Sequence, residues 1–270
     1  MNKLMTRFFA LVLVLACLLP AMVSAADSPV LSRIVDSGTL RVGMSGNQPP
    51  FNMFNNQGDI IGFDHDMARL LADAMGVELK IVTMPFPELL PALDKGKVDM
   101  VMSGVTMTPQ RNLKAAFVGP YLVSGKAILT KSQTLAAIDE AEDLDQSDLT
   151  IVALKGSTSE AFTKRVAPGV NLKTTDDYDK AVAMVLEGKV DAMVADFPIC
   201  ALTLLRHPEA GLATTLDPLT IEPMGIALPA GDSLLLNMVT NYFSALEAVG
   251  LMELLEIRWF EDGSWLAEMP

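Results

Sequence analysis

The chain is poor in cysteine and histidine, with only two residues of each type among 270. Cys17 falls in an N-terminal apolar segment, so Cys200 has no partner for an intramolecular disulfide. His65 and His207 are far apart and have no cysteine or histidine neighbours at the spacing of metal ligands. We therefore expect no disulfide framework, no metal and no other cofactor. Cys200, in the apolar run 197–205, is expected to be a small buried hydrophobic side chain.

Positive charge is also scarce. Twenty lysine and arginine residues stand against 33 aspartate and glutamate residues, which gives a formal net charge of −13. Such a balance repels the phosphates of nucleic acids and the surface of anionic membranes. The sequence therefore excludes nucleic acid and anionic lipid surfaces as partners. It leaves the charge of a small ligand open, because a binding pocket is local.

The first residues have the three parts of a secretory signal peptide. Lys3 and Arg7 form a positive region, residues 8–23 form an uncharged apolar run, and residues 23–25 fit the small-residue rule for signal peptidase. We expect residues 1–25 to be removed and the mature protein to lie in the periplasm.

Two other interpretations of this segment are less favoured. The apolar run is short for a membrane span of about 20 residues, and Pro20 interrupts it, so a retained anchor is the weaker alternative. Residues 14–17 loosely fit a lipobox, which would attach a lipid at Cys17. The residues that follow Cys17 stay apolar, whereas the tether of a lipoprotein is normally polar.

Short strand-like runs alternate with amphipathic helical patterns, an order that is typical of βα units. The predicted strands are 40–44, 78–84, 98–103, 126–130, 149–154, 190–195 and 225–228. The predicted helices, each followed by a glycine that can end a helix, are 64–75, 88–95, 177–187 and 233–249. The pattern predicts an α/β fold with mostly parallel sheets flanked by helices.

One motif occurs twice. Gly96-Lys-Val-Asp99 and Gly188-Lys-Val-Asp191 each follow a predicted helix and lead into an apolar strand. The repeat indicates two similar α/β lobes, although a common helix-to-strand turn would also explain it. Ligands of open α/β sheets bind beyond the carboxyl ends of the strands, so residues 103–106 and Asp196 would then share a cleft.

Arg111 stands close to the first of these strand ends. Thr108 and Pro109 are typical of the N-cap and the first position of a helix, which places Arg111 in the first turn. That turn usually prefers an acidic side chain, so an arginine there favours a specific anion. Its planar guanidinium binds a carboxylate through two hydrogen bonds. A surface salt bridge is the alternative.

Asp196 stands at the second strand end. Buried carboxylates are rare unless they are paired, and a ligand ammonium could supply the missing charge. Capping the helix that begins near Pro198 is the alternative role. In the same lobe, Ser157 and Glu160 form a capping-box pattern. The turn at Gly156 would leave backbone N–H groups free for a ligand anion, although plain capping explains the pattern equally well.

Together these residues predict a site for a zwitterion. Arg111 matches a carboxylate, Asp196 matches an ammonium, and hydroxyl groups lie between them, as a free amino acid requires. Phe51 and Phe86 follow prolines in loops expected at the cleft. They would cover the apolar part of a small ligand or fill the core of the first lobe. No catalytic residue is predicted.

The ordered set of motifs resembles the family 3 extracellular solute-binding proteins, the amino-acid receptors of ABC importers. The resemblance runs from about Ser37 to Phe260. It is carried by 38–43, 49–51, 62–66, 89–93, 96–99, 103–111 and 120–121. It implies a type 2 periplasmic-binding fold and a monomer. Two hinge crossings, near 122–126 and 219–225, would join lobe 1 (26–122 plus 225–270) to lobe 2 (126–220).

The resemblance also implies roles for the candidate residues. The ligand's α-carboxylate would be held by Arg111, Thr106, Ser157 and Thr158. Its α-ammonium would be held by Asp196 and the Gly104 carbonyl. Those that would contact the rest of the ligand are Phe86, Ser45, Gln48 and Leu154. Phe51 and Ser103, placed at the cleft above, complete the predicted site.

Three positions depart from the pattern of the family. Gln48 stands where many relatives carry an aromatic residue, Ser45 where receptors for basic amino acids can carry an acid, and Leu154 where a lysine can bind a polar side chain. These departures favour a neutral or polar amino acid. We expect a receptor that closes around this ligand by hinge motion and delivers it to the membrane permease of an ABC importer.

Two other functions fit the same resemblance. An enzyme similar to cyclohexadienyl dehydratase would need a general acid in the cleft, where the sequence offers Asp196 alone. A sensor for a membrane signalling partner would bind its ligand in the same way. We expect neither, and the protein is predicted not to be an enzyme.

Overall fold

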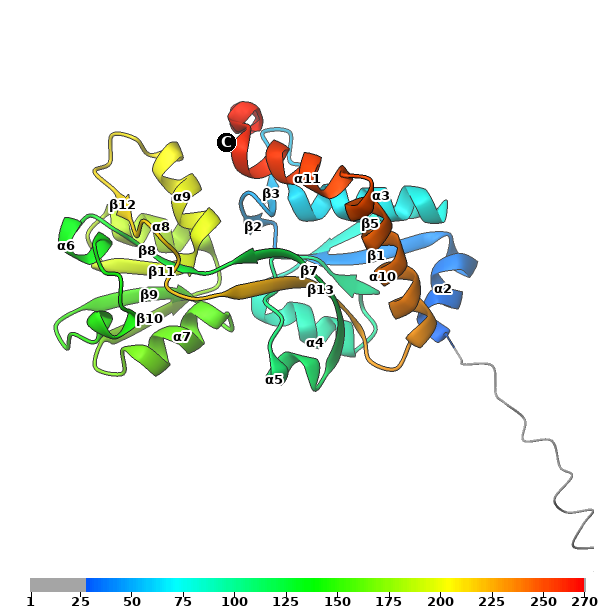
Figure 1. Cartoon of the computed structure of the whole chain (residues 1–270), viewed down its shortest axis with the longest axis horizontal. Helices are drawn as coiled ribbons and strands as arrows, with labels where there is room; N and C mark the ends of the chain where they lie inside the picture. The colour runs from blue at the N-terminus through cyan, green and yellow to red at the C-terminus, as the bar shows by residue number, and fades with distance from the viewer. Residues whose placement is uncertain (1–27, 270) are drawn as a thin grey trace, which may run out of the picture.

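The computed structural model describes residues 28–269, so the predicted signal peptide and the alternative lipid site at Cys17 lie outside the described residues. Two five-stranded sheets, each with its own helices, follow one another along the long axis of the molecule (Figure 1). We call the part built on the first sheet lobe 1 and the part built on the second lobe 2. The boundaries given above, 26–122 with 225–270 and 126–220, stay a proposal.

Lobe 1 is built on a sheet with the strand order β5-β1-β6-β13-β7. In chain order its strands are β1 (Thr39–Met44), β5 (Glu78–Thr83), β6 (Met100–Val101), β7 (Ala115–Ser124) and β13 (Glu222–Pro229). A small second sheet holds β2 (Asn47–Gln48), β3 (Asn52–Phe54) and β4 (Ile60–Ile61). The helices are α2 (Pro29–Ser37), α3 (Phe63–Met75), α4 (Leu89–Asp94), α5 (Pro109–Asn112), α10 (Ser233–Ala248) and α11 (Leu251–Glu256).

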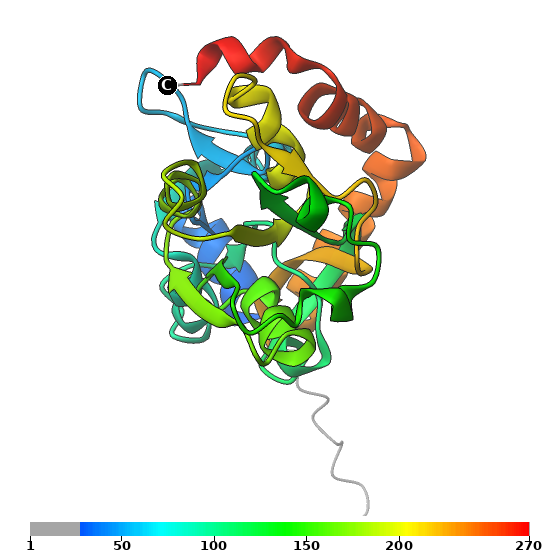
Figure 2. The ribbon, with the colours of Figure 1, turned by 90° about the vertical axis from the view of Figure 1, so that its left-hand side faces the viewer.

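Lobe 2 repeats this plan with the strand order β10-β9-β11-β8-β12. Its strands are β8 (Lys126–Thr130), β9 (Thr150–Leu154), β10 (Asn171–Thr175), β11 (Ala192–Asp196) and β12 (Ala213–Thr214). The helices are α6 (Gln133–Ala136), α7 (Thr158–Val166), α8 (Tyr178–Leu186) and α9 (Phe197–Arg206). Figure 2 looks at the molecule from the lobe 2 end and shows these helices around the strands.

The sheets are mixed, whereas the sequence predicted mostly parallel ones. The strands joined through helices are parallel, namely β1 with β5 and β6, and β9 with β10 and β11. The strands next to the crossings are antiparallel: β13 to β6 and β7, and β8 to β11 and β12. The difference arises because β7 and β13 carry the chain out of lobe 1 and back, as a two-stranded ribbon (Figure 1).

The repeated Gly-Lys-Val-Asp motif forms the same structure in both lobes. Both glycines are left-handed, with φ angles of 64° and 68°. The N–H of Asp99 donates to the Arg41 carbonyl at 2.8 Å, and its carboxylate accepts from the Arg41 N–H at 2.7 Å. Asp191 makes the same two bonds to Thr150, at 2.8 and 2.7 Å. A common turn would give these bonds as well, but the turn leads in both lobes to the central strand of a five-stranded sheet, which supports two similar modules.

The two crossings touch each other at Gly125. Ser124 lies opposite Glu222 in the ribbon, and the Lys126 N–H donates to Thr220 Oγ1 at 2.9 Å. A Cβ atom on Gly125 would lie 1.9 Å from the Thr220 carbonyl oxygen, so a larger residue would push the crossings apart. The crossings therefore hold Lys126 and Glu222 side by side, between the lobes.

No single helix within residues 28–269 is both long and apolar enough to cross a membrane. The helical segments Ser233–Ala248 and Leu251–Glu261 pass that test only as a pair, and the pair is bent by 81°.

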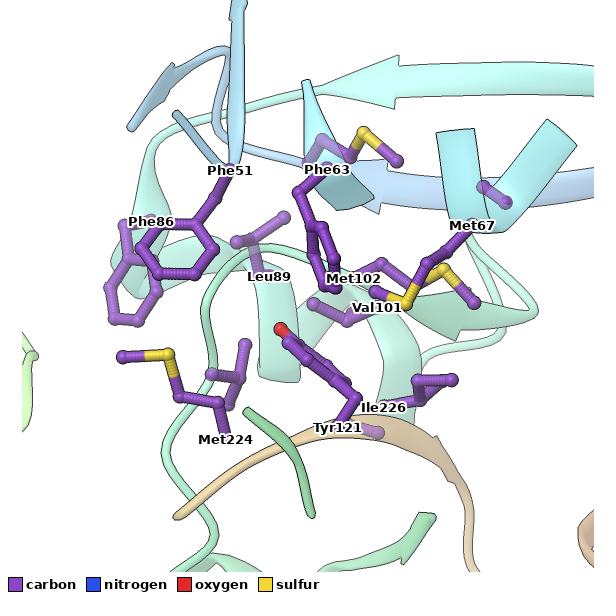
Figure 3. Packing of buried hydrophobic residues seen from close by; sticks show 14 of the residues in the cluster. Phe51, Phe63, Met67, Phe86, Leu89, Val101, Met102, Tyr121, Met224 and Ile226 are labelled. Carbon is purple, nitrogen blue, oxygen red and sulfur yellow. The ribbon is translucent and has the colours of Figure 1, made fainter. Parts of the chain in front are cut away.

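The core of lobe 1 packs large apolar side chains between the sheet and α3 (Figure 3). Asp64, at the start of α3, is fully buried beside it. Its carboxylate accepts from Asn52 Nδ2 at 2.9 Å, the Gly104 N–H at 3.0 Å and the Tyr121 hydroxyl at 3.0 Å. Burial outweighs these three donors and raises the pKa of Asp64 to about 7. Cys200 is also fully buried, as predicted, and burial raises the pKa of its thiol to about 12.

We predict that Asp64→Asn flattens the pH dependence of stability. Asp64 keeps its proton up to about pH 7 when folded, against an ordinary value of 3.8. Between these values the folded state binds more protons than the unfolded state, so the free energy of unfolding falls as pH rises. This contribution is about 1.4 kcal/mol per pH unit, and the substitution removes it. Urea unfolding at a series of pH values measures the slope.

Asp73→Asn, an exposed position on the same helix, is the control and should keep the wild-type slope. Equal slopes for Asp64→Asn and the wild type would contradict the prediction.

Candidate functional site

Arg111 reaches from lobe 1 to lobe 2. Thr108 caps α5 as predicted, because its hydroxyl accepts from the Arg111 N–H at 3.2 Å. The guanidinium donates through Nη1 to the Thr106 carbonyl at 2.8 Å, and through Nη2 to the Gly156 carbonyl of lobe 2 at 3.3 Å. Its Cζ atom also lies 5.8 Å from the centre of the Phe86 ring. In the part of the chain that the structure describes, this guanidinium forms no salt bridge.

Asp196 closes β11 and occupies the N-cap position of α9, but its side chain makes no capping hydrogen bond. The capping alternative is therefore wrong. Its Oδ1 atom instead accepts from Lys126 Nζ at 2.6 Å. The charge that the sequence expected a ligand to supply is thus already supplied by the chain. Whether Asp196 also binds an ammonium stays a prediction.

Lys126 is the residue that the sequence reasoning missed. Its side chain is fully buried and lies 2.6 Å from Asp196, 2.6 Å from Thr158 Oγ1 and 3.4 Å from Glu222 Oε2. Two of the three N–H donors of this ammonium are taken by Asp196 and Thr158, and Glu222 completes the cluster as an ion pair. One signal stood in the sequence: Lys126 opens a strand whose next three residues are apolar. A charged residue in such a strand requires a buried partner.

Glu222 adds a second carboxylate to this group, from the returning crossing. Asp196 and Glu222 share one lysine, so this side of the cleft carries an excess of one negative charge. Arg111 faces it from lobe 1. Burial lowers the pKa of Arg111, and the nearby carboxylates of Asp196 and Glu222 oppose that shift. The cleft therefore presents opposite charges from its two sides.

Two hydroxyl groups meet across the cleft. Thr106 Oγ1, after β6, lies 3.2 Å from Thr158 Oγ1, at the start of α7. Ser157 caps α7 as predicted, by accepting from the Glu160 N–H at 3.2 Å, and its own hydroxyl donates to the Leu154 carbonyl at 2.6 Å. Thr106 and Thr158 are thus brought together with Arg111, whereas the Ser157 hydroxyl is used inside lobe 2.

The turn before α7 does not leave the free N–H groups that we predicted. The Lys155 N–H donates to the Thr175 carbonyl at 2.7 Å, and the Ser157 N–H donates to the Leu154 carbonyl at 3.2 Å. The Gly156 N–H donates to the Glu160 carboxylate at 2.7 Å. The prediction is wrong for these three groups, because backbone carbonyls accept from Lys155 and Ser157 and the Glu160 side chain reaches past the cap residue to Gly156.

The predicted lobe 1 residues form one hydrogen-bonded group. Ser45 Oγ and Ser103 Oγ both donate to Gln48 Oε1, at 2.7 and 2.5 Å, and the Ser45 N–H donates to Ser103 Oγ at 3.0 Å. Gly104 follows with a left-handed φ of 54°, and a Cβ atom there would lie 3.5 Å from Gln48 and Phe51. The two hydroxyls and the Gln48 carbonyl oxygen thus pair with one another at the strand end.

The predicted apolar contacts are buried. Phe51 packs edge-on against Phe260 with ring centres 5.5 Å apart, so it fills the lobe 1 core (Figure 3), as one of the two interpretations proposed. Leu154 is fully buried in lobe 2, and Phe86 is 7% exposed beside Arg111. The contact of each with a ligand stays a prediction.

A cavity of about 260 Å³ opens between the lobes next to Ser45. Its walls come from both lobes and combine polar and apolar residues: Ser45, Asn47, Phe54, Thr83, Met84, Pro85, Asp176, Asp177 and Lys180. At its edge Asn47 Nδ2 donates to the Asp176 carbonyl at 3.5 Å, a further bond between the lobes.

Known proteins share this architecture. The profile of the bacterial extracellular solute-binding proteins, family 3, matches residues 40–262. The L-cystine-binding protein TcyJ of Escherichia coli is 30% identical over 88% of this chain and 88% of its own length. The cyclohexadienyl dehydratase of Pseudomonas aeruginosa is 30% identical over 94% of this chain and 95% of its own.

A solved structure agrees with these relatives. A binding component of an ABC transporter from Wolinella succinogenes, complexed with lysine, superposes with a TM-score of 0.80. It is 37% identical and covers 85% of this chain and 99% of its own. The similarity to such structures confirms the predicted type 2 periplasmic-binding fold.

We predict that Lys126→Met lowers the free energy of unfolding by about 3–5 kcal/mol, because it leaves buried carboxylates without a counter-charge. Adding Glu222→Gln should recover part of this loss, since only one buried carboxylate then remains. Urea denaturation without added ligand measures both variants.

Lys164→Met is the matched control. It removes an exposed ion pair with Glu160 on α7 and should cost about 1 kcal/mol or less. A Lys126→Met protein as stable as this control would show that the buried cluster contributes nothing.

Proposed function

Because this chain belongs to the bacterial extracellular solute-binding proteins, family 3, we propose that it is an exported receptor for one free amino acid. It delivers this ligand from the periplasm to the membrane permease of an ABC importer. One observation carries the proposal: Arg111 of lobe 1 faces the excess negative charge around Lys126 across the cleft. An α-amino acid carries a carboxylate and an ammonium on one carbon atom, so it neutralises the charge on each side of the cleft.

The ligand's α-carboxylate binds Arg111. The Thr106 and Gly156 carbonyls each accept from one N–H group of the guanidinium. A guanidinium has five N–H groups, so three remain to donate to a carboxylate. The hydroxyls of Thr106 and Thr158 add to this grip. The α-ammonium binds Asp196, whose second oxygen is not engaged by Lys126, with Glu222 adding charge and the Gly104 carbonyl a second acceptor.

The ligand's side chain extends toward Ser45 and the cavity beside it. Gln48 and Ser103 support this wall from behind. Hydroxyl and amide groups on the cavity wall, beside the apolar Phe54 and Met84, favour a neutral or polar amino acid. The relatives bind different side chains, L-cystine in one case and lysine in another, so the shared grip is on the backbone of the amino acid.

Closure of the two lobes completes the site. Arg111 and Thr106 come from lobe 1, whereas Thr158 and Asp196 come from lobe 2. A ligand that touches both sets stabilises the closed form over the open form, which is the differential affinity that closure requires. One chain supplies every group of the site, so the receptor works as a monomer.

A thermal-shift screen tests this function. We expect one of the common L-amino acids or L-cystine to raise the unfolding temperature, since a ligand at 100 times its Kd adds about 2.7 kcal/mol of stability. Arg111→Ala should weaken calorimetric binding of that amino acid by about 3–5 kcal/mol, because a desolvated charge pair loses one partner. Arg69→Ala removes the same charge at an exposed position and should bind normally. A flat panel, or normal binding by Arg111→Ala, contradicts the proposal.

A dehydratase is the second candidate function, because a cyclohexadienyl dehydratase matches 94% of this chain at 30% identity. Such an enzyme needs a group that gives a proton to the leaving hydroxyl. Here Asp196 accepts a hydrogen bond from Lys126, and Glu222 forms an ion pair with the same ammonium at 3.4 Å. We therefore propose binding without catalysis.

Incubation with prephenate or arogenate decides between the two. The absorbance of an aromatic product measures turnover. We expect none above the rate in buffer alone. Turnover that Glu222→Gln abolishes would identify Glu222 as the proton donor and overturn the receptor-only function.

A further inference from the structure

Lys126 connects the acidic side of the cleft to the hydroxyl pair that lies beside Arg111. Its ammonium lies 2.6 Å from Asp196 Oδ1 and 2.6 Å from Thr158 Oγ1. Thr158 Oγ1 lies 3.2 Å from Thr106 Oγ1, and the Thr106 carbonyl accepts from Arg111 at 2.8 Å. A continuous row of polar groups thus runs from Asp196 to Arg111.

Lys126 sets the direction of the hydrogen bonds in this row. A lysine ammonium only donates, so Thr158 Oγ1 must accept from it. The proton of the Thr158 hydroxyl then points away from Lys126, toward Thr106 or toward a group in the cleft. Either arrangement leaves one hydroxyl proton of the pair free to face an anion beside Arg111.

Without Lys126 the direction would reverse. Asp196 and Thr158 are both within hydrogen-bond distance of the same nitrogen, so they are close neighbours. A bare carboxylate is the strongest acceptor near Thr158, and hydrogen bonds to charged groups are stronger than those to neutral ones. Without the ammonium, the Thr158 hydroxyl is free to rotate its proton toward the negative charge of Asp196, and its lone pairs then face the ligand's carboxylate.

We propose that Lys126 is a positioning residue that sets the selectivity for a free α-carboxylate. It does not touch the ligand. By occupying both Asp196 and Thr158, it keeps one hydroxyl proton of the Thr158–Thr106 pair turned toward the carboxylate on Arg111. This inference rests on the proposed function and adds to it: the site discriminates an amino acid from its α-carboxamide partly through a residue on the crossing.

A double-mutant cycle tests the link between Lys126 and Thr158. The cycle compares the wild-type protein with Lys126→Met, Thr158→Val and both together. The probes are the amino acid selected from the common L-amino acids and L-cystine, and its α-carboxamide. Calorimetry gives the ratio of the two Kd values, and circular dichroism confirms that each variant folds.

We expect Lys126→Met and Thr158→Val each to reduce the preference for the carboxylate about tenfold, the size of one hydrogen bond to a charged group. The double variant should reduce it no further, since both changes remove the same donor. Thr158→Ser keeps the hydroxyl and should keep the preference.

Other outcomes overturn the inference. Additive losses, or an unchanged preference in Lys126→Met, show that Lys126 does not act through Thr158. If Lys126→Met does not fold, Lys126→Gln replaces it: this side chain keeps an N–H donor without the charge and should retain most of the preference. A fall to the Thr158→Val level would refute a positioning role. Failure of every amino acid to bind the wild-type protein overturns the proposed function instead, so the two failures are distinct.

Discussion

The arrangement of the cleft depends on one buried ammonium group. Lys126 opens β8 directly after the chain leaves lobe 1, and no part of its side chain is exposed. Its partners come from three other places: the end of β11, the start of α7 and the returning strand β13. A charge this deep is tolerated only with its partners in place, because the loss of one leaves an uncompensated charge. The crossings, the second sheet and the first turn of α7 must therefore come together around it.

Gly125 and the repeated modules make this position available. The absence of a side chain at Gly125 lets the two crossings touch, which sets Glu222 within reach of Lys126. The matching bonds of Asp99 and Asp191 fix β6 and β11 in equivalent places, so the strand that ends at Asp196 points into the cleft as the strand before Thr106 does. The opposite charges across the cleft therefore depend on the equivalent positions of β6 and β11 and on the contact of the two crossings at Gly125.

The local part of this arrangement could be predicted from the sequence, and the long-range part could not. Thr108 and Ser157 cap their helices as expected, because capping depends on residues three positions apart. The pairing of Lys126 with Asp196 spans 70 positions and depends on which strands become neighbours. No periodicity specifies that neighbourhood. The sequence therefore identified Asp196 as a carboxylate in need of a counter-charge but assigned that charge to a ligand, while Lys126 was predicted only as the start of a strand.

The same cluster bears on why one fold serves both as receptor and as enzyme. A receptor needs groups that bind better in the closed form than in the open form, whereas an enzyme needs groups that bind the transition state better than the substrate. Lys126 favours the first requirement, because it fixes Asp196 and Thr158 in one hydrogen-bonding state. A carboxyl oxygen that accepts from a lysine carries no proton to give to a substrate. Converting such a site to a dehydratase would require a protonated carboxyl group that does not accept a hydrogen bond from Lys126. Glu222, whose Oε2 lies 3.4 Å from the ammonium, is the best placed side chain for that role.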